Sequence, residues 1–422
     1  MRIREILRTT KVTCPTVDVD PLRKEYLYLD IQMFASKVKR LLDEGDVCLN
    51  LGSVSSAAVR QMILYTIAKK CYVFEKYKSS RKEPHTLWLK DGGADLKDIL
   101  KKIHMCDFIR DFENEPSNII NPQTFGEYVG QVFKKVRGVK IQVFDDRQCR
   151  DMGLNLVAAM GNGSVNPCRF LVLEYLPIKN GPAIGMVGKG VTFDTGGNDL
   201  KTGKAMSFKM KADKTGGCIV VGLVKYLAEN KLPCNVVGCI PLIDNSLSGS
   251  SVKPGDIVRS FNGKTVEILN TDAEGRLIMA DAFGYLCDKY TVDYLIDLAT
   301  LTGWSELLHC DHVASYFCVN KKLADLVYDV GERIGERVVP LPRWPEYSLY
   351  TKSDVADYKN YEFEECSKPG GFMASMFLWN FVPNTLKQKW IHFDITNDHT
   401  GHLSNGNCAI LALELVLRLS RL

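Results

Sequence analysis

From about residue 137 to the end of the chain, apolar runs of strand length alternate with longer stretches of helical character. The strand-like runs are KIQVF, FLVLEYL, AIGMV, NVVGCIPLI, VEIL, YLIDLATL and WIHFDI. The helix-like stretches are CIVVGLVKYLAEN, LIMADAFGYLCDKY, MASMFLWNFV and CAILALELVLRL. Strands that alternate with helices are typical of an α/β domain whose sheet is buried on both faces. We therefore predict a mixed, mostly parallel central sheet flanked by helices, with ligands at the carboxyl ends of its strands.

The first hundred residues differ from the rest of the chain. They are rich in Lys and Arg, and their apolar runs (VCLNLG, CYVFEKY and HTLWLK) lie between helical patterns. A chain of 422 residues is longer than one hydrophobic core usually serves. We predict two domains: a smaller α/β domain over residues 1–100 and a larger α/β domain over residues 101–422.

Composition narrows the class of protein. The net charge of +4 gives only weak support for a nucleic-acid partner. The 14 cysteines include no C-x-x-C pair, which favours reduced, buried thiols in a reducing compartment. The N-terminus has no apolar signal-peptide core, and the chain has no uninterrupted apolar stretch of about 18 residues. We expect a soluble, cytoplasmic protein.

The stretch NTDAEGRL, residues 270–277, places Asp272, Glu274 and Arg276 between two apolar runs. The pattern predicts a strand up to residue 270, a loop over 271–276 and a helix from 277 onward. Two carboxylates on one side of an extended loop repel each other unless a cation lies between them. The alternative is that both acids only cap the helix and complement its dipole. This stretch alone leaves both interpretations open.

A second cluster of charges follows another apolar run. The segment GMVGKGVTFDTGGNDLK, residues 185–201, carries Lys189, Asp194 and Lys201 among five glycines. Its spacing does not fit the phosphate-binding pattern GxxxxGK[ST], because Asn198 stands where the first Gly is required. The glycines permit tight turns, so we interpret this loop as one that presents side chains.

A third acid, Asp213, precedes an apolar helix, where it could equally be a helix cap. With Asp194, Asp272 and Glu274 it makes four carboxylates, a set that suits two divalent ions sharing a bridging acid. Lys189 could join them as a neutral amine ligand. Lys201 and Arg276 would then remain as cations facing a substrate.

These segments resemble the leucyl aminopeptidase family, the hexameric dizinc metallopeptidases also called cytosol aminopeptidases. NTDAEGRL matches the signature of that family without change. The family's other segments follow in its order: NEPSNIINP, VGKGVTFDTGG, IPLIDNSLSGSSVKPGDIVRSFNGKTVEILNTDAEGRLIMADA, LIDLATLTG, KSDVADYKN and GGFMASMFLWNFV. The likeness covers roughly residues 105 to 395, whereas the first hundred residues are divergent and shorter than the family's N-terminal domain.

The resemblance implies a role for each charged residue. One metal ion would be held by Asp194, Asp272 and Glu274, and the other by Lys189, Asp194, Asp213 and Glu274. Lys201 would stabilise the oxyanion that forms on the scissile carbonyl. Arg276 would hold a bicarbonate ion, or an equivalent water, as general base. The metals would be Zn²⁺ or Mn²⁺.

The resemblance also implies a function. The chain would remove N-terminal, preferably Leu-like, residues from short peptides, with Met210, Thr300, Leu301 and Gly303 lining the side-chain pocket. It would assemble as a homohexamer. Two alternatives from other classes are a DNA-binding regulator and a scaffold without peptidase activity. The retained ligand set argues against a scaffold, and the alternation of basic with acidic residues argues against DNA binding.

The chain departs from the family's pattern at several places. Asn198 and Asp199 replace an apolar and a small residue beside the site, where the acid could alter metal preference. Lys214 follows Asp213 where the family has Met, and we interpret it as a solvent-facing side chain. Trp304 replaces a small residue and puts the pocket shape in doubt. Two H-x-x-H pairs, His309 with His312 and His399 with His402, are interpreted as solvated loop residues rather than as a structural zinc site.

Overall fold

The computed structural model describes residues 2–5, 14–19, 21–80, 83–90, 95–203, 208–309, 313–342, 344–363, 370–396, 399–400, 403–404 and 406–422. The chain divides into two compact units. The smaller unit comprises Met1–Asp107 and Gly331–Glu336, and the larger comprises Phe108–Val330 and Arg337–Leu422. The assignment of residues 1–100 and 101–422 to separate domains stays a prediction, because compactness does not test whether either part folds alone.

The smaller unit is built on a parallel sheet with the strand order β1-β4-β3-β2. Its elements are β1 (Arg2–Glu5), β2 (Thr16–Asp18), α1 (Leu27–Glu44), β3 (Val47–Asn50), α2 (Ala57–Lys70), β4 (Thr86–Lys90) and the first part of α3 (Leu96–Asn114). Helix α1 buries Ile31, Phe34, Ala35, Val38 and Leu42, a spacing of three and four residues that gives one apolar face. The predicted smaller α/β region is therefore confirmed.

The larger unit contains a mixed sheet of nine strands among its described residues. Its strands are β5 (Val139–Phe144), β6 (Arg169–Tyr175), β7 (Ala183–Gly188), β8 (Gly190–Asp194), β9 (Asn235–Asn245), β12 (Tyr294–Ala299), β13 (Ala314–Phe317), β14 (Val338–Pro340) and β16 (Trp390–Asp394). The order is β14-β13-β16-β12-β7-β9-β6-β5, and β8 also pairs with β9. The centre, β16-β12-β7-β9, is parallel. Strands β13 and β6 pair antiparallel with its two edges, and β5 pairs antiparallel with β6. The predicted mixed, mostly parallel sheet is confirmed.

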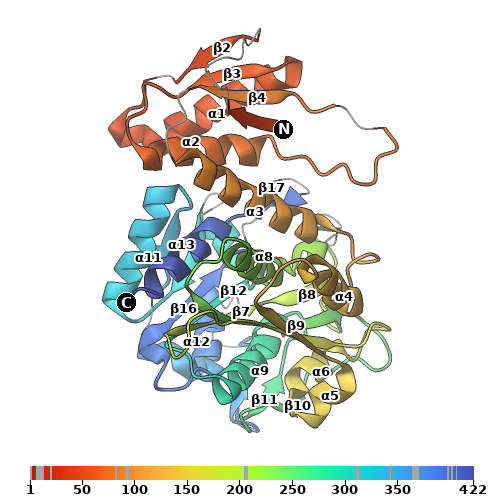
Figure 1. The fold of residues 1–422 in the computed structure, drawn as a ribbon. Helices are drawn as coiled ribbons and strands as arrows, with labels where there is room; N and C mark the ends of the chain where they lie inside the picture. Colours follow the sequence, from red (N-terminus) through yellow and green to blue (C-terminus); the bar gives the residue numbers. More distant parts are fainter. Residues whose placement is uncertain are drawn as a thin grey trace. The chain divides into compact units, whose positions relative to one another are not determined.

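Helices cover both faces of this sheet, with α8 on one face and α9 and α6 on the other (Figure 1). The described α-helices that lie wholly in the larger unit are α4 (Pro122–Phe133), α5 (Asp146–Asp151), α6 (Asn155–Gly161), α8 (Thr215–Glu229), α9 (Glu274–Lys289), α10 (Trp304–His309), α12 (Gly371–Trp379) and α13 (Ala409–Leu419). The second part of α3 and most of α11 (Lys321–Ile334) also belong to it. Strands β7 and β9 are buried along their whole length, as a sheet covered on both faces requires. No described helix is both long enough and apolar enough to cross a membrane.

One predicted strand lies outside the central sheet. Residues of the VEIL run form β11 (Thr265–Ile268), which pairs antiparallel with β10 (Asp256–Arg259) and parallel with β15 (Tyr358–Lys359). A further hairpin pairs β17 (His399–Thr400) with β18 (Leu403–Ser404). The loop after β11 therefore reaches the site from a separate small sheet, a placement that a short apolar run cannot reveal.

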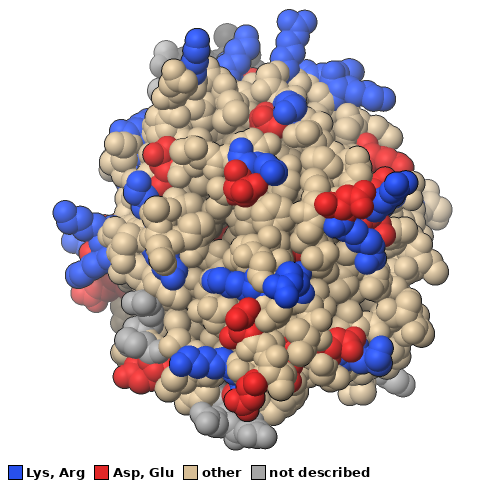
Figure 2. Space-filling view, turned by 90° about the horizontal axis from the view of Figure 1, so that it is seen from below, with Lys and Arg blue, Asp and Glu red and all other residues tan. Residues whose placement is uncertain are grey.

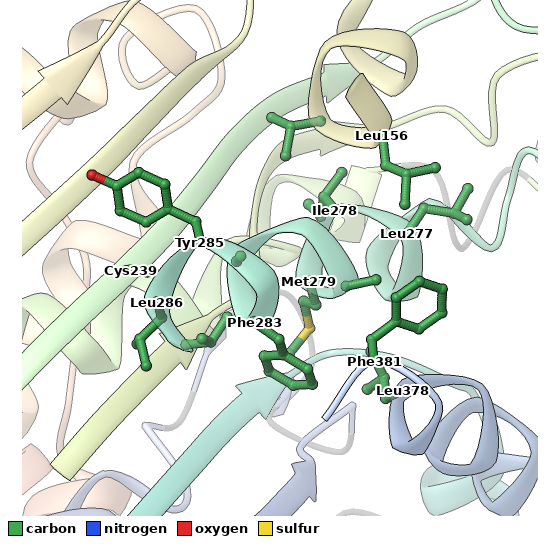
Figure 3. Close-up of a cluster of buried hydrophobic side chains, with 14 of the residues drawn as sticks. Leu156, Cys239, Leu277, Ile278, Met279, Phe283, Tyr285, Leu286, Leu378 and Phe381 are labelled. Carbon is green, nitrogen blue, oxygen red and sulfur yellow. The ribbon is translucent and has the colours of Figure 1, made fainter. Parts of the chain in front are cut away.

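Helix α9 is fixed by the hydrophobic core on one side of the sheet (Figure 3). Leu277, Ile278 and Phe283 of this helix are fully buried and pack in a cluster with side chains from other elements, among them Leu156 of α6 and Leu378 of α12. Burying one such side chain stabilises a fold by about 1.5–3 kcal/mol. The core therefore holds the first turn of α9, which carries Glu274 and Arg276, in one place.

Candidate metal centre

Five potential ligands come together from separate segments of the larger unit. Lys189 lies between β7 and β8, and Asp194 ends β8. Asp213 follows the short 3₁₀ helix η2 (Phe208–Ala212) and precedes α8, while Asp272 lies in the turn between β11 and α9. Glu274 is the first residue of α9. All five are buried except Asp272, which is half-buried.

Lys189 is at the centre of one half of the cluster. Its Nζ lies 2.8 Å from Asp213 Oδ1 and 2.9 Å from Glu274 Oε1. The same nitrogen donates to the carbonyl oxygen of Thr300 at 2.7 Å. Gly275 has no room for a side chain, because a Cβ there would lie 2.6 Å from Lys189 Cε. The glycine of NTDAEGRL thus lets the Lys189 side chain pass close to the start of α9.

Lys201 is at the centre of the other half. Its Nζ lies 2.9 Å from Asp194 Oδ2 and also contacts Asp272 Oδ1. Carboxylate oxygens of Asp194, Asp272 and Glu274 lie within 4.8 Å of one another. Three acids this close form a set that one divalent cation could bridge.

The capping part of the alternative interpretation is wrong, whereas its dipole part applies to Glu274, which lies in the first turn of α9. The residue that caps α9 is Ala273 and the residue that caps α8 is Lys214, and neither helix has a side-chain hydrogen bond at its cap. The predicted start of α9 was also late, because Glu274 and Arg276 belong to its first turn rather than to a loop. Helical backbone fits here because an acid is stabilised at the positive end of the helix dipole.

The crowding of the acids perturbs their protonation. Burial, followed by the charge of Asp194, raises the pKa of Asp272 to about 7. Burial likewise raises the pKa of Asp213 and of Glu274. Lys189 partly offsets this rise at both acids, and Lys201 does so at Glu274. Burial alone would lower the pKa of the Lys189 amine, but the charges of Asp213 and Glu274 outweigh it and raise that pKa. The cluster therefore has an excess of carboxylate over cation, which added positive charge would relieve.

Arg276 lies beside this cluster on the first turn of α9. Its Nη1 donates to the carbonyl oxygen of Asn360 at 2.8 Å, while its Nε is buried without an acceptor among the described residues. Burial lowers the pKa of Arg276 to about 10. A buried guanidinium with an unused donor is suited to holding a small anion or water.

Comparison with known protein families shows to which family the chain belongs. The family model described as the cytosol aminopeptidase family, catalytic domain, matches residues 107–409. The chain belongs to the cytosol aminopeptidase family. This confirms the resemblance read from NTDAEGRL and its companion segments.

Curated relatives with matching names are similar to the chain over most of its length. It is 40% identical over 317 residues to a "Probable cytosol aminopeptidase" of Chloroherpeton thalassium, an alignment that covers 74% of this chain and 60% of the relative. A protein of the same name from Rickettsia canadensis is 36% identical over 334 residues, covering 77% of this chain and 66% of the relative. The chain thus spans less than two thirds of the length of these relatives.

The fold is shared by the bottromycin maturation enzyme BotP. That structure superimposes with a TM-score of 0.82 at 26% identity, covering 93% of this chain and 88% of BotP. A structure of BotP in complex with Mn matches equally well, at 27% identity. The agreement extends beyond the segment that the family model matches.

The residues of this cytosol aminopeptidase family member fit a metal centre. Asp213 Oδ2 and Glu274 Oε2 are buried and have no hydrogen-bond donor within the described parts of the chain. Leaving a buried carboxylate oxygen unpartnered costs about 1–3 kcal/mol or more. A divalent cation would supply the positive partner that such an oxygen lacks, so the donor set is that of a site for a hard or borderline ion.

A layer of side chains behind the acids was missed by sequence reasoning. Asn245, at the end of β9, donates from Nδ2 to Asp194 Oδ1 at 2.8 Å and to Thr271 O at 2.9 Å. Asn360 binds the backbone of residues 269–273 through its side chain. Asp394, at the end of β16, accepts hydrogen bonds from Leu301 N and Thr302 N at 3.2 and 3.3 Å. Asn245 and Asp394 end buried strands, which was the available signal for them, whereas Asn360 follows a half-buried strand of two residues that gives none.

The departures from the family pattern have structural explanations in two cases. Asp199 Oδ2 accepts a hydrogen bond from Thr271 N at 2.7 Å, so this acid braces the NTDAEGRL loop. The interpretation of Lys214 as solvent-facing is wrong, because its side chain is fully buried. Its Nζ donates to the carbonyl oxygens of Glu115, at 3.0 Å, and of Lys211. Burial lowers the pKa of Lys214 to about 8, and the two carbonyls explain how its head group is accommodated.

The predicted pocket residues lie on two loops next to the ligands. Met210, half-buried, is on η2 just before Asp213, and Leu301 and Gly303 follow β12. A methyl group built on Gly275 would come within 3.0 Å of Leu301 Cδ1, so Leu301 adjoins the start of α9. The hydroxyl of Thr300 is directed at Asp213.

Two other expectations concern the edges of the site. The ring of Trp304 lies against Gly370, where an added Cβ would come within 3.1 Å of Trp304 Cδ2. Its effect on the pocket stays a prediction, as does the interpretation of the histidine pairs. His312 and His402 lie outside the described residues, as does the side chain of His399.

Proposed function

We propose that the chain is a metal-dependent aminopeptidase that removes N-terminal residues from short peptides. One observation carries the proposal: five potential ligands from separate segments converge, and buried oxygens of Asp213 and Glu274 are left without donors. The family assignment of residues 107–409 supports the same reaction class. The names of the relatives in Chloroherpeton and Rickettsia agree with it.

In this proposal Asp194, Asp272 and Glu274 hold one divalent ion, and Lys189, Asp194, Asp213 and Glu274 hold a second. When bound, such ions acidify a water nucleophile and polarise a carbonyl. Zn²⁺ and Mn²⁺ both suit ligands of this kind, and the Mn complex of BotP supports the use of Mn²⁺ on this fold.

The chain's own residues supply the remaining chemistry. Lys201, held near Asp194 and Asp272, stabilises the negative charge that develops on the scissile carbonyl oxygen. Arg276 orients a bicarbonate ion or a water that accepts the proton of the nucleophile. A free substrate amine binds within the acidic cluster, which restricts cleavage to the first residue. Met210, Leu301 and Gly303 line an apolar pocket that favours Leu-like side chains by about 1–3 kcal/mol per methylene.

A cytoplasmic homohexamer is part of the proposal, on the strength of the family resemblance. The DNA-binding alternative is not carried forward. Lys and Arg side chains are interspersed with Asp and Glu on the face drawn in Figure 2 and form no continuous basic stripe there.

The test uses the full chain after removal of metal and reconstitution with Mn²⁺ or Zn²⁺. Leucyl dipeptides and their N-acetylated counterparts are incubated with it, and free amino acids are identified by mass spectrometry. We expect release from the free-amine peptides only, and its loss on chelation. Internal cleavage, or no release by folded protein that has bound metal, would overturn the proposal.

A further inference from the structure

Thr300 occupies a position that connects two potential ligands of the same ion. It follows β12 and is buried, with 6% of its surface exposed. Its Oγ1 donates to Asp213 Oδ1 at 2.6 Å, and its carbonyl oxygen accepts from Lys189 Nζ at 2.7 Å. Asp213 and Lys189 are the two residues proposed for the second ion alone. One residue therefore touches both ligands that distinguish this ion from its neighbour.

The hydroxyl of Thr300 and the amine of Lys189 together occupy one oxygen of Asp213 and leave the other available. Oδ1 accepts from both Lys189 Nζ, at 2.8 Å, and Thr300 Oγ1. Oδ2 is buried and has no donor in the described structure. A carboxylate with one oxygen held by two donors is fixed in rotation, and its other oxygen is then presented in a defined direction.

The backbone on both sides holds Thr300 itself in place. Strand β12 pairs with β16 up to Ala299, the residue before Thr300, and with β7 up to Leu298. On the other side, Leu301 N and Thr302 N donate to the buried carboxylate of Asp394. The position of the hydroxyl is thus set by the sheet, as expected of a group that orients a ligand in advance.

We propose that Thr300 is a positioning residue that sets the affinity of the ion held by Lys189 and Asp213, separately from the affinity of the other ion. This inference rests on the proposed two-ion function. In this inference Thr300 orients a ligand rather than only lining the substrate side-chain pocket, because its hydroxyl donates its hydrogen to Asp213.

Asn245 provides a matched comparison on the opposite side of the centre. Its amide donates to Asp194 Oδ1 at 2.8 Å, and Asp194 is the acid proposed to bridge both ions. Removing the Thr300 hydroxyl should therefore lower the affinity for one ion, whereas Asn245→Ala should lower the affinity for both.

The experiment measures Mn²⁺ binding to the full-length protein by calorimetry and by metal analysis after equilibrium dialysis. Thr300→Val removes the hydroxyl at nearly constant shape, Thr300→Ala removes it without adding a methyl group beside Asp213, and Thr300→Ser restores it. We expect Thr300→Val and Thr300→Ala to lose about 10- to 100-fold in affinity for one of two bound ions, as outer-layer changes usually do. Thr300→Ser should recover wild-type affinity for both ions.

Two results would overturn the inference. The first is wild-type affinity for both ions in a folded Thr300→Val and Thr300→Ala. The second is a raised KM with unchanged metal affinity, which would make Thr300 a pocket residue. Failure of the wild-type protein to bind any ion would instead refute the proposed function, so the two failures are distinguishable.

Discussion

Asn360 offers the sharpest test of how the NTDAEGRL loop is held. It follows β15 and is buried, with 1% of its surface exposed. Its Oδ1 accepts from Leu269 N and Asn270 N at 2.8 and 3.2 Å, and its Nδ2 donates to Asn270 O at 2.7 Å. Its own carbonyl oxygen accepts from Arg276. The Asn360 side chain therefore holds the start of the loop that carries Asp272, while Asp199 and Asn245 hold Thr271 farther along it.

The substitution Asn360→Ala removes three side-chain hydrogen bonds shorter than 3.3 Å. At about 1 kcal/mol for each bond, the loss of stability is about 3 kcal/mol. For a unit of this size, that corresponds to a thermal midpoint lower by roughly 5 °C. Metal affinity should fall as well, because ordering the loop then has to accompany binding.

The assay combines thermal unfolding followed by tryptophan fluorescence with Mn²⁺ titration of the same samples. Asn360→Asp is the informative companion, because it keeps the acceptor for the two backbone N–H groups and loses the donor to Asn270 O. The carboxylate that it introduces would face the Asn270 carbonyl oxygen in a buried position, so its loss of stability should be at least as large as that of Asn360→Ala. An Asn360→Ala protein with the wild-type midpoint and wild-type metal affinity would refute the reasoning.

Three further predictions follow from the site. Asp272→Asn removes one proposed ligand, so affinity for one ion should fall by at least about 100-fold, more than the loss of a residue that only hydrogen-bonds a ligand. Equilibrium dialysis measures this affinity, and unchanged stoichiometry and affinity would contradict the prediction. Burial and Asp194 raise the pKa of Asp272 to about 7, so protons compete with metal below that pH. Affinity for Mn²⁺ should therefore rise between about pH 6 and 8, with release of protons that calorimetry in two buffers measures. Binding that does not depend on pH would exclude titrating ligands. Lys214→Met removes the hydrogen bonds that Lys214 donates to Glu115 O and Lys211 O. The free energy of unfolding should fall by about 1–3 kcal/mol, measured as a lower thermal midpoint. The same change at Lys321, whose side chain is 85% exposed, should have little effect.

The sequence predicted the fold class because strand-length apolar runs alternate with helical stretches. It could not show that β11 belongs to a separate sheet, since a four-residue run carries no information on its partners. The start of α9 was placed late because charged residues at its first turn looked like a loop. Those charges are compatible with helix because Glu274 lies at the positive end of its dipole.

The potential metal ligands could be predicted from the sequence because they are charged residues that interrupt apolar segments. Lys189, Asp194, Asp213, Asp272 and Glu274 all stand at the edges of buried segments, where a charge needs a partner. The layer behind them was not predictable, because an Asn or Thr at a strand end is common and its partner is distant in sequence. Lys214 was misread for a related reason: a lysine is usually exposed, and only the carbonyl groups of residues 211 and 115 accommodate its head group.

The most direct measurement follows metal binding and peptide hydrolysis in the same samples. Mn²⁺ is added stepwise to metal-stripped protein, with Asp272→Asn alongside, while bound metal and the release of leucine from a fluorogenic leucyl amide are recorded. The account predicts no turnover without metal, turnover that rises as the two ions bind, and little or none in Asp272→Asn. Turnover in stripped protein, or folded protein that binds both ions and hydrolyses no substrate with a free amine, would contradict it.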